Sequence, residues 1–316
     1  MLMTLEMGKP LAEARGEVAY GAEFFRWFSE EAVRIHGRYA VSPNGATRLM
    51  TMKQPVGPTL MITPWNFPLA MGTRKIGPAI AAGCTMVVKP AAQTPLTMLL
   101  LTQVLIECGV PAGVLNVVTT AHTGAVMEPI IRDPRLRKLT FTGSTEVGQR
   151  LVAQSADSLL RLSMELGGNA PFIVFEDADL DRAVDGAMLA KMRNIGEACT
   201  AANRFLVHES VAEEFGRRFA ERMGALTVGK GTVKGIDVGP LVDKKARDSV
   251  DALVQEAVAG GATVLTGGGP LPGKGWFYAP TVITNVPTNA RIAVEEIFGP
   301  VAPISTFATE AEAIAR

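Results

Sequence analysis

Short apolar segments alternate with helical segments through the first half of this chain of 316 residues. The apolar segments, rich in Val, Leu, Met and Ile, lie at residues 59–62, 86–88, 114–118 and 138–141. Helical patterns follow at residues 69–82, 95–108 and 124–132, and one more begins near Ser144. Short apolar strands that alternate with helices imply a parallel sheet with both faces covered. The sequence therefore predicts an α/β fold.

The residues before this series are predicted to form a long helix and a hairpin. Residues 10–36 mix apolar residues with Glu and Arg in the pattern of an amphipathic helix. Residues 38–62 read as extended chain, and Asn44-Gly45 is a strong hairpin turn signal. We therefore expect a β-hairpin over residues 38–53.

A second domain is predicted to begin near Gly167. Its expected elements are a strand, a helix, a strand and a long helix, at residues 172–175, 180–193, 204–208 and 212–226. The Gly- and Pro-rich residues 267–275 are expected to form a loop. A length of 316 residues also favours two domains.

Composition and charge exclude several classes of function. Apolar residues make up 47% of the chain, which is enough for sizeable cores. The formal net charge is zero, so nothing favours binding to nucleic acid or to a membrane surface. No apolar run could span a bilayer, and the N-terminus has no secretory pattern. Three cysteines without paired spacing favour a reducing compartment, and the dispersed histidines form no zinc motif. We expect a soluble, cytoplasmic protein without a metal.

Two segments combine residue types that suit nucleophilic catalysis. Residues 194–205 place Cys199 between small and polar residues, which is typical of a thiol held at a turn. Glu165 lies in the Gly-rich residues 164–171, which read as a bend. A thiol and a carboxylate on separate turns suggest a nucleophile and a general base. The alternatives are a buried, inert thiol and a solvated turn residue.

Other segments become informative only in combination. Asn66 stands between two prolines in residues 63–68, where an asparagine is often only a turn former. Residues 141–148 read as a strand, a glycine turn and a helix start, a geometry that suits a pyrophosphate. Such junctions occur in every α/β protein. Lys89 before a Pro-capped helix and the acidic turn at residues 295–300 are, taken alone, ordinary surface features.

Together these segments resemble the aldehyde dehydrogenase superfamily. The resemblance runs along essentially the whole chain, because several separate motifs recur in the family's order. It implies a Rossmann-type cofactor domain at residues 1–166, with a hairpin used for oligomer contacts, and an α/β catalytic domain at residues 167–316. It also implies a homo-oligomer.

The resemblance assigns roles to the candidate residues. Cys199 would attack an aldehyde, and the Asn66 amide and the Cys199 backbone N–H would form an oxyanion hole. Glu165 would activate the water that hydrolyses the thioester, with its pKa raised by burial. The residues implied to bind the cofactor are Thr63, Trp65, Lys89, Ala91, Ala92, Gly143, Ser144, Leu166, Glu296 and Phe298.

The implied cofactor is NADP, with NAD as the alternative. Many NAD-using members carry glutamate where this chain has Ala92, and that carboxylate would repel a 2′-phosphate. By resemblance, Lys89 would hold the adenosine ribose or the 2′-phosphate. Ser144 would contact a phosphate, with Gly143 near the nicotinamide. Glu296 would bind the nicotinamide ribose.

Two arginines point to the substrate. Arg74 and Arg193 stand where succinate-semialdehyde dehydrogenases carry the arginines that grip the substrate carboxylate. By resemblance the chain oxidises succinate semialdehyde to succinate, a step of γ-aminobutyrate catabolism. The alternatives are another ω-carboxylated aldehyde, such as glutarate semialdehyde, and a catalytically silent cofactor-binding fragment. A CoA-dependent acylating enzyme is disfavoured, because such members lack the base that Glu165 supplies.

Family members carry considerable chain before the position of Met1 and after that of Arg316. Thr309 is a candidate N-cap followed by acidic residues, so a helix is expected to begin there. We expect these residues alone to expose sheet edges and apolar faces. Aggregation and little turnover would follow.

Overall fold

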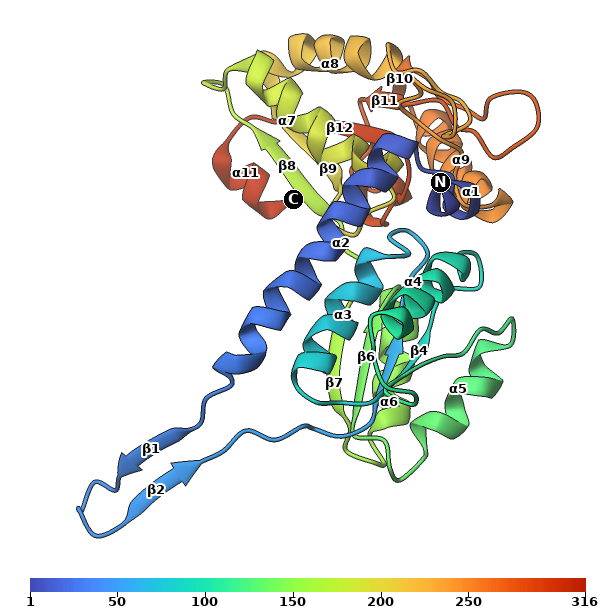
Figure 1. The fold of residues 1–316 in the computed structure, drawn as a ribbon. Coiled ribbons are helices and arrows are strands. Elements are labelled where there is room, and N and C mark those ends of the chain that lie inside the picture. The colour runs from blue at the N-terminus through green and yellow to red at the C-terminus, as the bar shows by residue number, and fades with distance from the viewer. The chain divides into compact units, whose positions relative to one another are not determined.

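The computed structural model describes all 316 residues and divides them into two compact units, whose elements are drawn in Figure 1. One unit contains residues 15–166, and the other contains residues 3–14 together with 167–316.

Residues 3–14 do not belong to the domain to which we assigned them. We expected residues 1–166 to form one domain. Leu11, however, donates its backbone N–H to the carbonyl oxygen of Gly231 at 2.9 Å. A Cβ on Gly8 would lie 2.7 Å from the carbonyl oxygen of Pro240. The segment is thus fixed by backbone contacts with residues distant in sequence, which no local pattern reveals.

The unit of residues 15–166 is built on a five-stranded parallel sheet with the order β5-β4-β3-β6-β7. Its strands are β3 (Thr59–Ile62), β4 (Met86–Lys89), β5 (Leu115–Val117), β6 (Lys138–Thr142) and β7 (Arg161–Glu165). Its sheet-covering helices are α3 (Ala70–Ala81), α4 (Leu96–Glu107), α5 (Thr123–Ile131) and α6 (Thr145–Ser155). The predicted series of strands and helices is confirmed, as is the α/β fold.

Neighbouring positions of the central strands pack on opposite faces of this sheet, as the two-residue repeat of a strand requires. Leu60 and Leu139 join a buried cluster that includes Met127 of α5. Met61 joins a different cluster that includes Ile76 of α3. Both faces are therefore covered, which explains why β3 and β4 consist mostly of apolar residues.

A long helix and a hairpin precede the sheet. The helix α2 (Leu11–Glu31) continues into the short helix η1 (Ala32–Arg34). The strands β1 (Arg38–Val41) and β2 (Arg48–Thr51) then pair antiparallel, with Val41 opposite Arg48, so the predicted hairpin is confirmed. Gly45 has a φ of +71°, which the tight turn needs. None of the helices combines the length and apolar composition needed to cross a bilayer.

The other unit has its own five-stranded sheet, with the order β10-β11-β12-β9-β8. Its strands are β8 (Ala170–Val174), β9 (Ala202–His208), β10 (Thr263–Thr266), β11 (Thr281–Thr284) and β12 (Val301–Phe307). The β10–β11 pair is antiparallel and the others are parallel. Its helices after residue 167 are α7 (Leu180–Met192), η2 (Arg193–Gly196), α8 (Glu209–Gly224), α9 (Lys244–Ala259), α10 (Arg291–Val294) and α11 (Glu310–Ala315).

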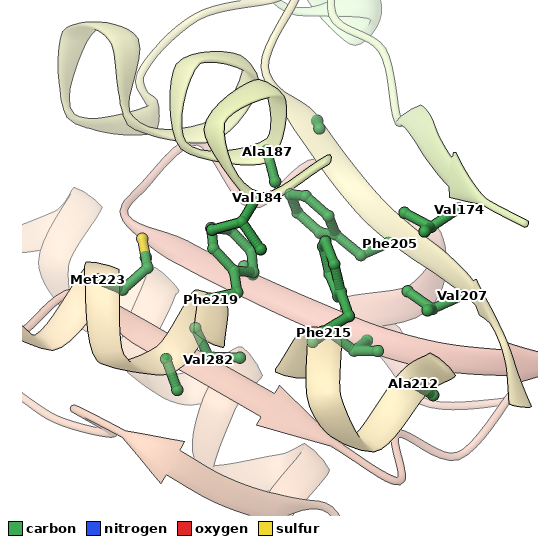
Figure 2. Packing of buried hydrophobic residues seen from close by; sticks show 14 residues of the cluster. Val174, Val184, Ala187, Phe205, Val207, Ala212, Phe215, Phe219, Met223 and Val282 are labelled. Atoms are coloured by element: carbon green, nitrogen blue, oxygen red, sulfur yellow. The ribbon is translucent and has the colours of Figure 1, made fainter. Parts of the chain in front are cut away.

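Aromatic packing fills the core on one face of this second sheet (Figure 2). The ring of Phe219 on α8 lies 5.1 Å from that of Phe205 on β9 and 5.6 Å from that of Phe215. Ala187 of α7 belongs to the same cluster. A separate cluster contains Val254 of α9. The first cluster also contains Phe205 and Val207 of β9, so α7 and α8 hold one face of this strand, which follows the segment of Cys199.

Two local predictions have different outcomes. Thr309 caps α11 as expected, because its hydroxyl accepts the backbone N–H of Glu312 at 3.3 Å. Glu165 does not lie on a bend but is the last residue of β7, a strand that we did not predict. This strand alternates exposed and half-buried residues at the sheet edge, and only its pairing with β6 identifies it.

Candidate active site

The carboxyl ends of the parallel strands gather most candidate residues of the unit 15–166 at one edge of its sheet. Ile62 is paired with both Lys89 and Phe141, and Thr142 is paired with Glu165. The segments that begin after these positions therefore start side by side. The outer edge at the carboxyl ends of the strands is where open α/β sheets bind ligands.

The segment after β3 holds Asn66 in a buried position. The backbone N–H of Thr63 donates to the carbonyl oxygen of Lys89 at 3.1 Å, which extends the ladder by one residue. The Trp65 carbonyl oxygen accepts the hydroxyl of Thr94 at 3.4 Å. Asn66 is only 4% exposed. Backbone and side-chain contacts thus fix this turn in place.

Two hydroxyls at this edge lack a hydrogen-bond partner in the protein. They belong to Thr63, just after β3, and to Thr142, at the end of β6, and both oxygens are buried. Buried polar atoms normally have a partner, so unpartnered ones need an explanation. Their position suits a polar ligand that lies along the carboxyl ends of the strands.

The turn after β6 leads into the N-terminus of the helix α6. Ser144 is the N-cap of α6, and its hydroxyl accepts the backbone N–H of Val147 at 3.4 Å. A Cβ on Gly143 would lie 2.4 Å from the ring of Phe141, so only glycine fits. Leu166 packs so closely on Gly148 of α6 that a Cβ there would lie 2.5 Å away. The exposed helix start can bind an anion.

Lys89 and its neighbours form a second polar position at this edge. Lys89 is 6% exposed, and burial lowers the pKa of its ammonium. Ala91 is buried and Ala92 is exposed. The surface beside Lys89 therefore carries a methyl group at residue 92 and no carboxylate.

Glu165 differs from our expectation in its environment. We expected it to be buried, but its side chain is exposed because β7 is an edge strand. Its carbonyl oxygen accepts the backbone N–H of Gly143 at 3.0 Å. Its charge also reaches a residue that we did not single out, Lys75 of α3.

Lys75 is a buried lysine in an apolar helix. Its Nζ donates to the hydroxyl of Thr140 on β6 at 2.8 Å, and the residue is 8% exposed. Burial lowers the pKa of Lys75 to about 8, while the negative charge of Glu165 acts in the opposite direction. A lysine among the apolar residues of α3 was the signal in the sequence that could have identified it.

In the other unit, Cys199 follows a strained turn. Asn194, Ile195 and Gly196 of η2 have φ values of 55°, 64° and 78°. The first two are non-glycine residues in the left-handed region, which costs free energy and requires compensating contacts. The backbone N–H of Asn194 donates to Oε1 of Glu13 at 2.7 Å, and its side-chain amide donates to the carbonyl oxygen of Glu197 at 2.9 Å. Cys199, just beyond this turn, is exposed.

A buried carboxylate supports the same turn and was not predicted. Glu197 has no exposed surface, and its Oε1 accepts the backbone N–H of Val242 at 3.3 Å. Burial raises the pKa of Glu197, whereas the Val242 N–H and the charge of Lys9 lower it. The local sequence gave no signal for this role, because the groups that act on the Glu197 carboxyl, Val242 and Lys9, lie far away in sequence.

Glu296 lies against the backbone at the start of the same unit. Its Oε1 accepts the N–H of Gly168 at 3.4 Å, and a Cβ on Gly167 would lie 2.3 Å from its Oε2. A Cβ on Gly168 would lie 3.8 Å from the carbonyl oxygen of Cys199. The glycine pair thus lies close to both Glu296 and the Cys199 backbone. Phe298, nearby in sequence, is half-buried with a φ of 53°.

The two candidate arginines belong to different units. Arg74 on α3 is half-buried, and its guanidinium lies 5.7 Å from the ring centroid of Phe24. Arg193 is exposed and begins η2. Asn66 and Glu165 belong to the unit of Arg74, and Cys199 to that of Arg193.

Comparisons with known proteins bear on the whole chain. The profile of the Aldehyde dehydrogenase family matches residues 1–316. Succinate-semialdehyde dehydrogenase of Paenarthrobacter nicotinovorans is 63% identical over 99% of this chain and 70% of that protein. Glutarate-semialdehyde dehydrogenase of Pseudomonas aeruginosa is 50% identical over 99% of this chain and 65% of that protein. A crystal structure described as an E. coli NADP-dependent enzyme matches with a TM-score of 0.97 and 51% identity, over 99% of this chain and 65% of that one.

This chain thus spans 65–70% of the length of these proteins. The match to the family profile extends from the first residue to the last. The fold agrees with that of a solved structure whose sequence is 51% identical. The chain therefore belongs to the aldehyde dehydrogenase family.

Proposed function

We propose that this chain provides the nucleophile, the general base and the cofactor-binding residues of an enzyme that oxidises succinate semialdehyde to succinate. The observation that carries the proposal is the exposed thiol of Cys199 beside a turn of left-handed residues. A strained turn that its surroundings hold in place is typical of functional segments.

The chemistry is nucleophilic catalysis by a thiolate. Cys199 attacks the aldehyde carbon, and the carbonyl oxygen becomes an oxyanion. The Asn66 amide and the Cys199 backbone N–H donate hydrogen bonds to it, and such donors contribute about 3–4 kcal/mol each. Oxidation leaves an acyl thioester on Cys199. Glu165 takes a proton from the water that attacks the thioester, and the acid leaves while the thiol is restored.

A nicotinamide dinucleotide, when bound, supplies the acceptor for the hydride. The unpartnered hydroxyls of Thr63 and Thr142 and the capped start of α6 at Ser144 suit such a ligand. Lys89 binds the adenosine ribose or its 2′-phosphate, and Ala92 offers no carboxylate to oppose that phosphate. Trp65, Ala91, Gly143, Leu166 and Phe298 complete the cofactor-binding set that we propose.

Lys89 and the absence of a carboxylate at Ala92 favour NADP over NAD. The description of the matching crystal structure as an NADP-dependent enzyme supports the same preference. Glu296 would bind the nicotinamide ribose through its carboxylate.

The substrate class is a short aldehyde with a terminal carboxylate. Arg74 and Arg193 would bind that carboxylate, because a guanidinium offers paired donors in a matching geometry. Glutarate semialdehyde, one methylene longer, is the second candidate, since a relative named for it is 50% identical. A catalytically silent cofactor-binding chain is the alternative from another class of function.

The hairpin suggests how copies of the chain associate. Its apolar side chains are largely exposed, with Tyr39 at 69%, Met50 at 68% and Met52 at 72%. Clustered exposed apolar residues mark association surfaces. We therefore keep a homo-oligomer, formed through β1 and β2, as part of the proposal.

An NADPH-formation assay tests the function. Succinate semialdehyde, glutarate semialdehyde and butyraldehyde differ in length or in the terminal carboxylate, and Cys199→Ser serves as the inactive control. A higher kcat/KM for succinate semialdehyde than for either other aldehyde is expected. A preference for butyraldehyde would exclude the carboxylate class, and NADP binding without oxidation of any aldehyde would favour the silent rival.

A further inference from the structure

A fully buried lysine lies in the unit that carries Cys199 and takes no part in the proposed chemistry. Lys191 is next to the last residue of α7 and has no exposed surface. Its Nζ donates to Oδ1 of Asn203 at 3.1 Å. Asn203 on β9 is itself only 1% exposed. The lysine is therefore held inside the protein by a specific polar partner.

The hydrogen bonds continue from Asn203 to Glu296. Nδ2 of Asn203 donates to the carbonyl oxygen of Gly168 at 3.3 Å. The N–H of Gly168 donates to Oε1 of Glu296 at 3.4 Å. Gly167 confines the other carboxylate oxygen, because a Cβ there would lie 2.3 Å from Oε2. Lys191 is thus connected to the carboxylate through Asn203 and the two peptide groups of Gly168.

The charges of the two residues also act on each other. Burial lowers the pKa of Lys191 to about 7, and the negative charge of Glu296 opposes this shift. Burial raises the pKa of Glu296, and the Gly168 N–H and Lys191 lower it. A buried ammonium is costly unless it is paired, and an apolar side chain of similar volume could fill the space. Packing alone does not account for a lysine here.

We propose that Lys191 is a positioning residue for Glu296, which it holds through Asn203 and Gly168 in one orientation and in the ionised form that accepts hydrogen bonds from ribose hydroxyls. The inference rests on the proposed function, in which Glu296 binds the nicotinamide ribose. A carboxylate fixed beforehand loses less conformational freedom when the ligand binds, so affinity rises. The chemical class recognised is the hydroxyl pair of a ribose.

Binding of three ligands to the purified protein tests this inference without turnover. NADP and 2′-phospho-ADP-ribose both carry the second ribose, whereas 2′,5′-ADP carries only the adenosine half. Lys191→Met removes the charge at similar length, and Lys191→Gln removes the charge but keeps a donor for Asn203. Both variants are expected to bind NADP and 2′-phospho-ADP-ribose about tenfold more weakly, as measured by titration calorimetry. The affinity for 2′,5′-ADP should stay within twofold, roughly the scatter of such measurements.

A double-mutant cycle separates positioning from general support of the fold. In a Glu296→Gln background, Lys191→Met should weaken NADP no further. Lys9→Met removes another fully buried lysine of the same unit and should leave the ratio of NADP to 2′,5′-ADP affinity unchanged. Equal weakening of all three ligands by Lys191→Met, or an additive effect in the cycle, would overturn the positioning role.

The outcomes also separate this inference from the proposed function. If Glu296→Gln weakens NADP but neither Lys191 variant does, the inference fails and the proposed role of Glu296 stands. If Glu296→Gln leaves NADP as tightly bound as the parent, the proposed role of Glu296 fails, and the inference fails with it.

Discussion

Gly196 lies so close to Gly299 that a Cβ on Gly196 would come within 2.3 Å of the Gly299 carbonyl oxygen. Gly196 also has a φ of +78°, which L-residues rarely adopt. Both features fix the backbone of the turn that leads to Cys199, and both depend on the absence of a side chain at residue 196.

Gly196→Ala should therefore misplace the nucleophile. We expect the rate of the first hydride burst to fall more than about tenfold, the effect of about 1.4 kcal/mol on the barrier. The matched control is Gly235→Ala, because Gly235 has a φ of +83° with no atom within 4 Å of its added Cβ. Strain of about 1–2 kcal/mol should destabilise both variants, but only Gly196→Ala should lose the burst. Equal burst rates in the two variants would contradict the argument.

Glu165→Gln should separate oxidation from hydrolysis. The variant can still form the thioester but lacks the base that activates water, so one NADPH per active site should appear without further turnover. Rapid-mixing measurement of NADPH gives the burst amplitude. Cys199→Ser is the companion variant and should give no burst while NADP still binds. Steady turnover by Glu165→Gln near the parent rate would exclude Glu165 as the required base.

Arg193→Ala should matter more for a carboxylated aldehyde than for an uncharged one. Loss of one partner of a charge-assisted contact that the bound substrate buries costs about 2–5 kcal/mol, so kcat/KM for succinate semialdehyde should fall about 30-fold or more. Butyraldehyde makes no such contact and should change little. Arg182→Ala removes an exposed arginine of α7 and is the control. If Arg193→Ala slows both aldehydes equally, the carboxylate contact is disproved.

Ala92→Glu should shift cofactor preference toward NAD. The added carboxylate would accept hydrogen bonds from the adenosine ribose hydroxyls and repel a 2′-phosphate. The ratio of kcat/KM values for NADP and NAD measures the shift. Gln93→Glu places the same charge on the neighbouring exposed residue and should change the ratio less. An unchanged ratio in Ala92→Glu would locate cofactor discrimination elsewhere.

Lys75→Met should change how stability depends on pH. The pKa of Lys75 is about 8 in the folded protein, below its usual 10.5, so between these values the unfolded chain binds more protons. Lys75 therefore makes the free energy of unfolding rise with pH over this window. This gain in stability is lost as the pH falls through about 8.

Removal of the lysine removes this dependence. A pKa shift of this size corresponds to a destabilisation on the order of 3 kcal/mol by the buried lysine. Loss of its hydrogen bond to Thr140 costs the variant only about 1 kcal/mol. Lys75→Met should thus be more stable than the parent at pH 7, below this window, and close to it at pH 10, near the upper end of the window. Urea unfolding at both pH values measures the difference. A parallel pH profile for the two proteins would contradict the assignment.

Local patterns in the sequence predicted the elements whose apolar residues pack against apolar surroundings. Strands β3 and β4 consist mostly of apolar residues because both faces of the sheet are covered, so they could be located from residue types alone. Strand β7 could not, because it alternates polar and apolar residues at an edge and exists through its pairing with β6. The placement of residues 3–14 likewise depends on partners far along the chain.

The candidate residues divide in the same way. Residue types in turn-forming contexts singled out Cys199 and Glu165, and the family resemblance added a role for Asn66. Neither Lys75 nor Lys191 was singled out, although Lys75 stands among apolar residues, because a lysine is exposed by default and only the tertiary structure buries it. Burial sets the pKa of both ammonium groups and selects their partners. The residue types were thus determined by the sequence, whereas their environments, and with them their charges, were decided by the packing of distant segments.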